Sequence, residues 1–493
     1  MKNLLRILIL LPLFAQGQEH IIDPDFNDLE DRYKAEVNDL FYEPLDNTVL
    51  VVGWFPFGSP VSVPSIDKIS VNGIPDEDWD PQGIVNLDNL RSIHRVSDGY
   101  RLRTNPLMAQ LDFDGNFIEE TLLQYPDWEP IGNIYTAHIS EGDTIFVPGL
   151  FERVIDGESE YRQCLKFYPD GTLDESFIPC NCSLSTSSFA QYGLGFLKYD
   201  DERLIFTSSM DSINGHPTIK VARMFHNGRI DTSFVSQLSP EGGTGLLHVD
   251  DQGRILVTMA PRSTFFESDS LEVYRLMPDG SLDPSWNPID LGYTPNLSIG
   301  SLRQNAVVPL EDGGYILGGH FRYVNGIRRT SIVKVDSTGV VDESLFDNEP
   351  FWVDSETYPY TWFLTDSVPT VNDIIPLEDG ILVGGQFTHY GNTDRINLVK
   401  LILDETIGLN DSIKRLPLTV YPNPNSGVFT IQSNNSENIT SIEVFDLAGR
   451  KVSFEDSRAQ NKIEIAITAN PGLYIVKIVS EDGRIGSAKV REE

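Results

Sequence analysis

The side chains that could act as acids, bases or metal ligands are numerous, but they form no recognisable catalytic pattern. The eight histidines are scattered along 493 residues, and none belongs to an H-E-x-x-H or H-x-H motif. The chain also lacks a G-x-S-x-G elbow, a phosphate-binding loop and a dinucleotide fingerprint. A glycosidase-like carboxylate pair could be drawn from the 73 acidic residues. Because these residues recur at regular intervals, a role in turns is the better hypothesis, and no catalytic residue is predicted.

Three cysteines, Cys164, Cys180 and Cys182, are the remaining reactive side chains. In an oxidising compartment Cys164 can pair with Cys180 or with Cys182, which leaves one thiol over. The C-x-C spacing has no histidine at a ligand spacing, so no metal site is predicted from it. The stretch from Asp112 to Asn116 imitates the start of a calcium loop but lacks the closing glutamate. Calcium therefore stays an unsupported alternative, and no cofactor is expected.

A short acidic motif recurs along the chain, and "PDGSLDPSW" at residues 278–286 is its clearest copy. A glycine forms a tight turn, an aspartate follows three residues later, and an aromatic residue or leucine follows three residues after that. Glycine supplies the positive φ that a turn between strands requires. The aspartate can accept hydrogen bonds from exposed backbone N–H groups while the aromatic residue anchors the turn. The structural repeat turns are predicted at Asp76, Gly171, Asp174, Gly228, Asp231, Gly280, Asp283, Gly339 and Asp342, with a further start at Asp23 and a degenerate copy at Glu119.

A second motif, a turn followed by a short β-branched strand, alternates with the first. Good copies are "EDGGYILGGHF", which ends at Phe321, and "EDGILVGGQF", which ends at Phe387. Hairpin signals such as Asn325-Gly326 follow several copies. No segment has a sustained helical period. A repeat of about 50 residues with four short strands predicts a β-propeller, and the number of acidic motifs predicts seven blades.

The two ends of the repeat region look like halves of one blade. Residues Ile21–Phe26 carry the acidic motif without a strand motif before it, and Ile396–Asp404 carry a strand without the acidic motif after it. Pairing of the two would close the ring and cover free sheet edges. The motifs resemble the delta-60 repeat family of bacterial β-propellers over most of residues 18–404. That resemblance implies a propeller fold and an extracellular setting, but no particular activity.

The first 17 residues have the features of a secretory signal peptide. Lys2 and Arg6 precede an apolar run, and a small-x-small cleavage site ends at Gly17. The apolar run is far shorter than the roughly 20 residues that span a bilayer, and no transmembrane segment is predicted. The predicted domains are a signal peptide at 1–17, a β-propeller at 18–404, a linker at 405–415 and a C-terminal sorting domain at 416–493.

The C-terminal module has strands that alternate with period 2, which favours a small antiparallel β-sandwich of Ig-like type. The stretches "LTVYPNPNSGVFTI", "IEVFDLAGRKV" and "GLYIVKI" resemble the C-terminal sorting domain of the type IX secretion system of Bacteroidota. The resemblance implies that the secretion machinery is a partner, that the module is often removed, and that the remainder is attached to the surface or released. By this resemblance the sorting signal comprises Tyr421, Pro422, Asn423, Pro424, Gly472, Tyr474 and Lys489.

One aromatic insertion, Phe351–Phe363, is the best candidate for ligand binding. Its aromatic side chains could form a stacking surface for a sugar or a protein. The competing interpretation is an insertion that folds over the apolar edge of its own blade. The candidate ligand-binding residues are Trp352, Tyr358, Tyr360 and Trp362.

The net charge of −36 disfavours nucleic acid and anionic lipid as partners, because such a surface repels both. The sequence predicts an all-β protein, a seven-bladed β-propeller followed by a small Ig-like sandwich, that is secreted to the extracellular space or the outer-membrane surface. Its predicted role is a non-enzymatic binding or scaffold module for glycan or protein. The alternative is an extracellular propeller hydrolase or lyase that acts on polysaccharide.

Overall fold

The computed structural model describes most of the chain between residues 20 and 492, and all of its described regular structure is β-strand. An all-β fold is therefore confirmed. The predicted signal peptide and linker lie outside the described residues. The residues that the structure describes are 20–27, 36–44, 46–55, 63–79, 90, 92–96, 98–103, 107–125, 127–130, 138–139, 144–184, 195–208, 210–240, 244–259, 270–292, 301–343, 345–346, 351–354, 368–377, 380–403, 418–422, 425, 427–433, 439–446, 452–459, 462–467, 472–480 and 485–492.

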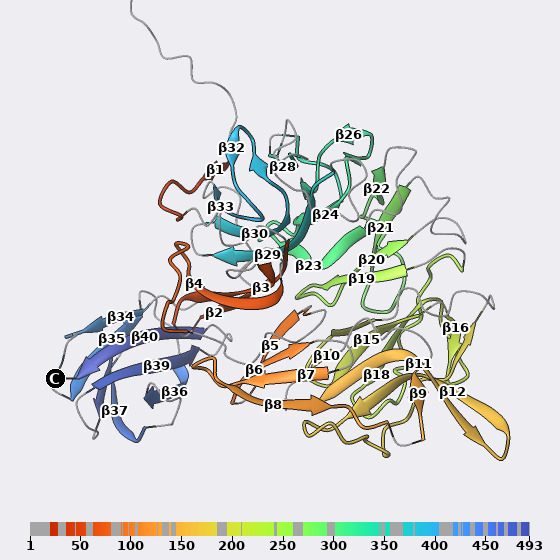
Figure 1. The fold of residues 1–493 in the computed structure, drawn as a ribbon, viewed down its shortest axis with the longest axis horizontal. Coiled ribbons are helices and arrows are strands. Elements are labelled where there is room, and N and C mark those ends of the chain that lie inside the picture. Colours follow the sequence, from red (N-terminus) through yellow and green to blue (C-terminus); the bar gives the residue numbers. More distant parts are fainter. Residues whose placement is uncertain are drawn as a thin grey trace, which may run out of the picture.

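Antiparallel sheets follow one another around the larger part of the protein (Figure 1). Within the described residues, seven of the sheets each contain an inner strand, and the inner strands of the last and first sheets lie against each other. The number of blades itself stays a prediction. The first three sheets are β2 (Glu36–Glu43), β3 (Thr48–Phe55) and β4 (Val63–Ser70); β5 (Ser92–Val96), β6 (Gly99–Arg103), β7 (Leu107–Leu111) and β8 (Phe117–Leu122); and β9 (Glu129–Pro130), β10 (His138–Ile139), β11 (Ile145–Ile155) and β12 (Glu158–Phe167).

The other four sheets repeat this arrangement. They are β14 (Gly195–Lys198), β15 (Arg203–Thr207) and β18 (Val221–Phe225); β19 (Thr244–Val249), β20 (Ile255–Met259), β21 (Ser270–Leu276) and β22 (Ile289–Gly292); β23 (Ser301–Pro309), β24 (Tyr315–His320) and β27 (Ile332–Val335); and β29 (Thr370–Leu377), β30 (Gly380–Gln386), β33 (Leu398–Leu403) and β1 (His20–Ile22).

Short outer hairpins connect neighbouring sheets. The hairpin β25–β26 turns at Asn325-Gly326 and pairs with β22, which belongs to the preceding sheet. Asn325 has a φ of +50° and Gly326 a φ of +76°, as a tight hairpin turn requires. The remaining outer strands are β13 (Cys182–Leu184), β16 (Met210–Ile213), β17 (His216–Pro217), β25 (Tyr323–Val324), β26 (Ile327–Arg328), β28 (Phe351–Trp352), β31 (His389–Tyr390) and β32 (Thr393–Asp394).

The first strand of the chain completes the last sheet. Strand β1 pairs antiparallel with β33, with His20 opposite Leu403 and Ile22 opposite Leu401 (Figure 1). This pairing joins the two ends of the repeat region, as the split motif predicted. The apolar cores lie between successive sheets, and one of them combines Leu40 and Val51 of the first sheet with Leu382 of the last. Burial between sheets supplies the main stabilisation of such a fold.

One predicted motif position is wrong. Glu119 lies within strand β8, opposite Gln110 of β7, instead of in a turn after a strand. In four other copies, a lysine or arginine at the position of Gln110 pairs with the turn aspartate, as described below. At this copy the chain instead continues as β8, the fourth strand of the sheet.

The C-terminal module consists of two antiparallel sheets that share one core. Residues such as Phe429 and Ile465 from one sheet pack with Val444 and Val476 from the other. Its Ig-like topology stays a prediction. Among the residues that the structure describes, no helix is long and apolar enough to cross a membrane. The strands are β34 (Leu418–Tyr421), β35 (Val428–Ser433), β38 (Lys462–Ile467) and β37 (Phe454–Ala459) in one sheet and β36 (Ile439–Asp446), β39 (Gly472–Ser480) and β40 (Ile485–Glu492) in the other.

Candidate functional site

Where the repeat has an aspartate, this residue organises the turn that follows the preceding strand of the sheet. The backbone N–H of Asp283 donates to the Arg275 carbonyl at 2.9 Å, and the N–H of Trp286 donates to the Asp283 carbonyl at 3.2 Å. Carboxylate oxygen Oδ1 of Asp283 accepts both the N–H and the hydroxyl of Ser285, at 2.9 and 2.6 Å. A side chain that satisfies local backbone donors in this way forms an Asx turn.

The same aspartate makes a buried ion pair with the preceding strand. Arg275 Nε lies 2.7 Å from Asp283 Oδ2, and the two side chains are 1% and 4% exposed. The Arg275 guanidinium also lies 4.5 Å from the centre of the Trp286 ring. Burial alone would raise the pKa of Asp283, but hydrogen bonds from Ser285 and Arg275 outweigh it and hold the pKa below its ordinary value. The carboxylate is therefore charged and fully engaged in structure.

The acidic repeat motif, as defined from the sequence, does not include these basic partners, which lie eight residues before the aspartate. The signal was a single lysine or arginine between apolar residues, as in "VYRL" and "IVKV". In the first copy, Lys68 pairs with Asp46 instead of Asp76. The matching pairs are Lys166–Asp174 at 2.9 Å, Arg223–Asp231 at 2.8 Å, Arg275–Asp283 at 2.7 Å, Lys334–Asp342 at 3.0 Å and, across the ring closure, Lys400–Asp23 at 2.8 Å.

The glycine turn of each blade packs on the preceding blade. Gly339 has a φ of +81°, and a Cβ atom there would lie 2.4 Å from the Asn287 carbonyl oxygen. The N–H of Asn287 donates to the Thr338 carbonyl at 2.7 Å, which joins the two blades directly. Only glycine combines that backbone conformation with such a close approach. Turn, aspartate and aromatic residue together therefore form an inter-blade lock, and the geometry gives them no catalytic arrangement.

Among the described residues, no group of three or more His, Cys, Asp or Glu side chains could hold a metal ion. Burial lowers the pKa of His248, so its imidazole is neutral at pH 7. The start of the calcium-like loop is an Asx turn, in which Asp112 Oδ1 accepts the N–H groups of Asp114 and Asn116 at 3.0 and 2.8 Å.

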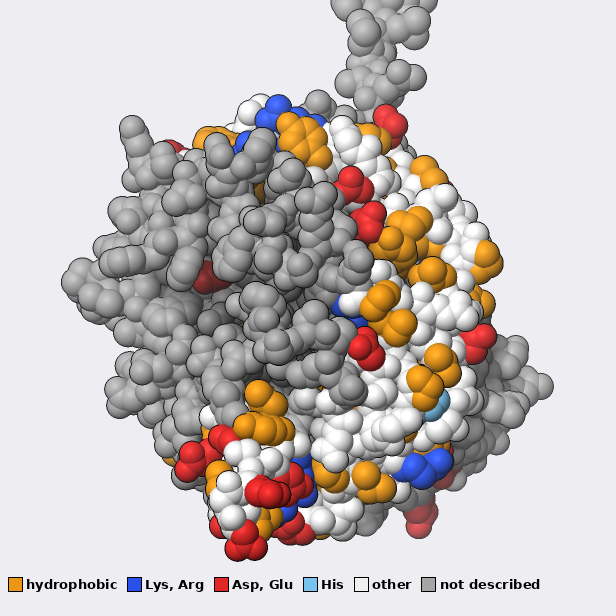
Figure 2. All heavy atoms as spheres, turned by 90° about the vertical axis from the view of Figure 1, so that its right-hand side faces the viewer, with side chains coloured by type: hydrophobic (Ala, Val, Ile, Leu, Met, Phe, Trp, Pro, Cys, Tyr) orange, Lys and Arg blue, Asp and Glu red, His pale blue; other side chains and the backbone are white. Residues whose placement is uncertain are grey.

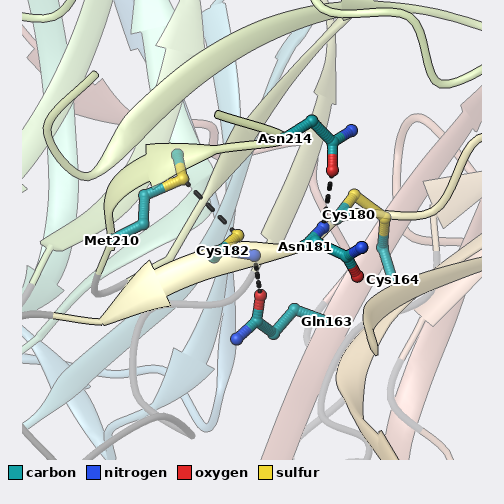
Figure 3. The surroundings of a disulfide bond; sticks show 7 residues. All are labelled: Gln163, Cys164, Cys180, Asn181, Cys182, Met210 and Asn214. Carbon is teal, nitrogen blue, oxygen red and sulfur yellow. Dashed lines mark hydrogen bonds between the residues drawn. A yellow bond between two sulfur atoms is a disulfide. The ribbon is translucent and has the colours of Figure 1, made fainter. Parts of the chain in front are cut away.

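The cysteines form one disulfide and one thiol (Figure 3). Cys164 of β12 is bonded to Cys180, and the unpaired cysteine is Cys182 of β13. The Cys182 sulfur points toward Met210, 3.7 Å from its thioether sulfur, while its backbone N–H donates to Gln163 Oε1 at 2.7 Å. Burial raises the pKa of the Cys182 thiol to about 12, so it is protonated and unreactive at neutral pH.

Trp352 is the one predicted ligand-binding residue that falls within the described residues, because Tyr358, Tyr360 and Trp362 lie outside them. Its indole stacks on His389, with ring centres 3.5 Å apart and planes 11° from parallel. Indole Nε1 donates to the Gly391 carbonyl at 2.8 Å, and 41% of Trp352 is exposed. His389 is fixed in turn by Asp394, at 2.8 Å. The ring is therefore held in one orientation and presented to solvent.

On the face shown in Figure 2, the exposed hydrophobic side chains lie in small groups among uncharged atoms, with acidic side chains between some of them. Scattered apolar residues are normal for a soluble surface and do not mark a docking site. A rigid, exposed aromatic ring such as Trp352 is a more specific feature.

The sorting-signal residues lie in the C-terminal sheets where the structure describes them. Tyr421 ends β34, and its hydroxyl donates to Gln432 Oε1 at 3.1 Å. Gly472 begins β39, in which Tyr474 is buried in the module core, and Lys489 of β40 is opposite Ile475. Asn423 and Pro424 lie outside the described residues. Pro422 follows Tyr421 through a cis peptide bond.

Two protein families match parts of the chain. Residues 419–490 match the secretion system C-terminal sorting domain. Residues 263–285, 310–345 and 377–404 match a domain of unknown function, DUF5122, described as a beta-propeller. No curated protein sequence matches the chain. The narrower assignment to delta-60 repeats stays a prediction.

Solved structures similar to this chain are remote from it in sequence. The extracellular domain of a proposed hybrid two component system from B. thetaiotaomicron is 10% identical, with a TM-score of 0.43, and the match covers 97% of this chain and 59% of that one. The Dos1 propeller is 11% identical, with a TM-score of 0.35 and coverage of 93% and 96%. An endo-arabinase from Bacteroides thetaiotaomicron is 12% identical, with a TM-score of 0.24 and coverage of 55% and 98%.

Similarities at this level carry no argument about activity, and the chain spans only 59% of the first of these structures. The family matches are more informative, since they cover three segments of the repeat region and residues 419–490 of the C-terminal module. The chain is therefore a β-propeller protein that carries the C-terminal sorting domain of the type IX secretion system and is secreted or held at the cell surface.

Proposed function

We propose that the mature protein is a non-enzymatic binding module outside the cell and that its ligand is a glycan. The observation that carries the proposal is the exposed indole of Trp352, which is stacked on His389 and hydrogen-bonded to the Gly391 carbonyl. A rigid aromatic side chain loses little conformational entropy on binding and offers a flat apolar surface. The apolar face of a sugar ring fits such a surface. A protein ligand is the other outcome that the binding test can return.

The route to the cell surface follows from the two chain ends. The proposal includes removal of a signal peptide at residues 1–17 and recognition of residues 416–493 by the type IX machinery of a member of the Bacteroidota. The match of the sorting domain to residues 419–490 supports the second step. The propeller is the cargo, and the sorting domain is removed or retained after passage.

The binding role is tested with the secreted full chain on an array of surface polysaccharides and proteins. Trp352→Ala is expected to weaken glycan binding at least tenfold, because buried tryptophans at interfaces often contribute about 2 kcal/mol or more. Tyr168→Ala, which removes an aromatic side chain that is 46% exposed elsewhere, is the matched control and should bind as the wild type does. Equal binding by the wild type and Trp352→Ala would refute this site. Release of sugar fragments during the assay would instead support the hydrolase or lyase alternative.

A further inference from the structure

Two buried aspartates occupy equivalent places at the junction of the last and first sheets. Asp39 lies in β2 within "VNDL" at residues 37–40, and Asp373 lies in β29 within "VNDI" at residues 371–374. Each follows a register shift in its strand, between Val37 and Asp39 and between Val371 and Asp373. The two residues are 4% and 3% exposed. The acidic repeat motif does not include either residue, and the proposed function does not use them.

Each aspartate reaches across to the inner strand of the next sheet. Asp373 Oδ2 accepts the N–H of Leu40 at 2.6 Å, so it joins the last sheet to the first. Asp39 Oδ2 accepts the N–H of Ile93 at 2.8 Å, so it joins the first sheet to the second. Asn372 strengthens the first of these junctions, since its Nδ2 donates to the Val37 carbonyl at 2.8 Å. The Asp373 carboxyl group is therefore one of the contacts that join the last sheet to the first.

The contact with Leu40 brings the Asp373 carboxyl group beside the backbone of Asp39, the residue before Leu40. Burial, the nearby charge of Asp39 and a hydrogen bond to the Asp39 carboxyl group raise the pKa of Asp373. Two ionised carboxylates have only acceptor oxygens, so a hydrogen bond between them requires one proton. One proton on Asp373 would let it donate to Asp39 while its Oδ2 still accepts the N–H of Leu40.

The other titratable groups at this junction belong to the strands packed around β29 and β2. Glu36 Oε1 accepts from Asn372 Nδ2 at 3.1 Å, and His320 Nδ1 lies 3.0 Å from the Thr370 hydroxyl. His94 of β5 lies 3.4 Å from the Ser92 hydroxyl. Among the described residues, these side chains and the two aspartates do not form a group that could hold a metal ion.

We propose that the junction of the last and first sheets is a proton-dependent clasp, in which Asp373 and Asp39 share one proton and loss of that proton loosens the ring. When the junction opens, Asp373 is hydrated and releases its proton near the ordinary aspartate pKa of about 3.9. The closed junction retains the proton to higher pH, because the pKa of Asp373 is raised there. The stabilisation is complete below about pH 4 and decreases as pH rises through the folded pKa, by about tenfold in the closing equilibrium per pH unit.

The clasp is tested by hydrogen exchange of the full chain between pH 5 and 9. Protection of peptides that contain the Leu40 amide is expected to fall by up to about tenfold per pH unit relative to peptides from β20, after correction for intrinsic exchange. The variant Asp373→Asn keeps an oxygen that accepts from Leu40 and gains an N–H that can donate to Asp39. Its protection at Leu40 should therefore not depend on pH.

Thermal unfolding of both proteins over the same pH range provides a second measurement. The Tm of the wild type should fall relative to that of Asp373→Asn as pH rises. Parallel pH profiles of the two proteins, in exchange and in Tm, would overturn the proposal. A rise in the wild-type Tm with millimolar calcium or sodium that is absent in Asp373→Asn would also overturn it, because the carboxyl pair would then hold a cation. Neither measurement depends on glycan binding, so it remains informative if the proposed function fails.

Discussion

At the scale of single residues, the buried pair of Arg275 and Asp283 shows what the acidic repeat contributes. Replacement of Asp283 by asparagine leaves Arg275, which is 1% exposed, without its counter-charge. Removal of one partner of a buried pair costs about 3 kcal/mol or more. We expect Asp283→Asn to lower the urea midpoint by a corresponding amount. Asp279→Asn is the control, since Asp279 is an exposed turn residue whose carboxylate accepts the N–H and the hydroxyl of Ser281 at 2.9 and 2.6 Å.

A change of less than about 0.5 kcal/mol for Asp283→Asn, similar to that expected for the exposed control, would show that the ion pair is dispensable. The pair also has a defined pH dependence. Because the folded pKa of Asp283 is lowered, its stabilisation is present above the ordinary aspartate pKa of about 3.9 and is lost as pH falls through the folded pKa. The stabilisation by Asp283 is lost as pH falls, whereas the stabilisation proposed for Asp373 is lost as pH rises.

At the scale of elements, the turns were readable from sequence because their residue types are unusual. Glycine, aspartate and an aromatic residue at fixed spacing identify each turn, and the structure places Gly280, Asp283 and Trp286 as such a turn requires. The basic partner was not readable, since a lysine or arginine inside a strand is common and its contact depends on the path of the next turn. Glu119 was also misassigned to a turn, whereas the structure places it in β8, opposite Gln110 of the preceding strand.

The cysteine pairing shows a second limit of sequence. Cys180 and Cys182 are two residues apart, so spacing alone could not select the partner of Cys164. The structure selects Cys180, and the side chain of Cys182 is directed to Met210 (Figure 3). Contacts between distant segments, such as Asp373 with Leu40, were equally inaccessible, because they exist only once the ring is closed.

The disulfide joins β12 to the segment before β13, and we expect it to stabilise both. A loop of 16 residues between bonded cysteines corresponds to about 3 kcal/mol of unfolded-state entropy. We expect the double variant Cys164→Ser and Cys180→Ser to lose about this amount in denaturant unfolding. Cys182→Ala is the matched control, and reductant should destabilise it as strongly as the wild type. Equal stability of the double variant and the wild type would show that the bond contributes nothing to folding.

At the scale of the whole molecule, the decisive feature is that the chain closes on itself. Strand β1 has only three residues, yet it provides the outer strand of the last sheet and places Asp23 against Lys400 at 2.8 Å. The two side chains are 6% and 2% exposed. The hydrogen bond from the Leu40 N–H to Asp373 lies at the inner strand of the same sheet. The ring is therefore held at both the inner and the outer strand of one blade.

Removal of β1 tests whether closure at the outer strand is needed. A chain that begins at Pro24 lacks β1 and Asp23, whereas a control chain that begins at His20 retains both. We expect the shorter chain to lose at least about 3 kcal/mol, because the buried ion pair is broken, and to self-associate through the exposed edge of β33. Thermal unfolding and light scattering measure the two effects. A shorter chain that stays monomeric and unfolds with the control would mean that the inner strands alone hold the ring, in which case Asp373→Asn should be the more sensitive probe of closure.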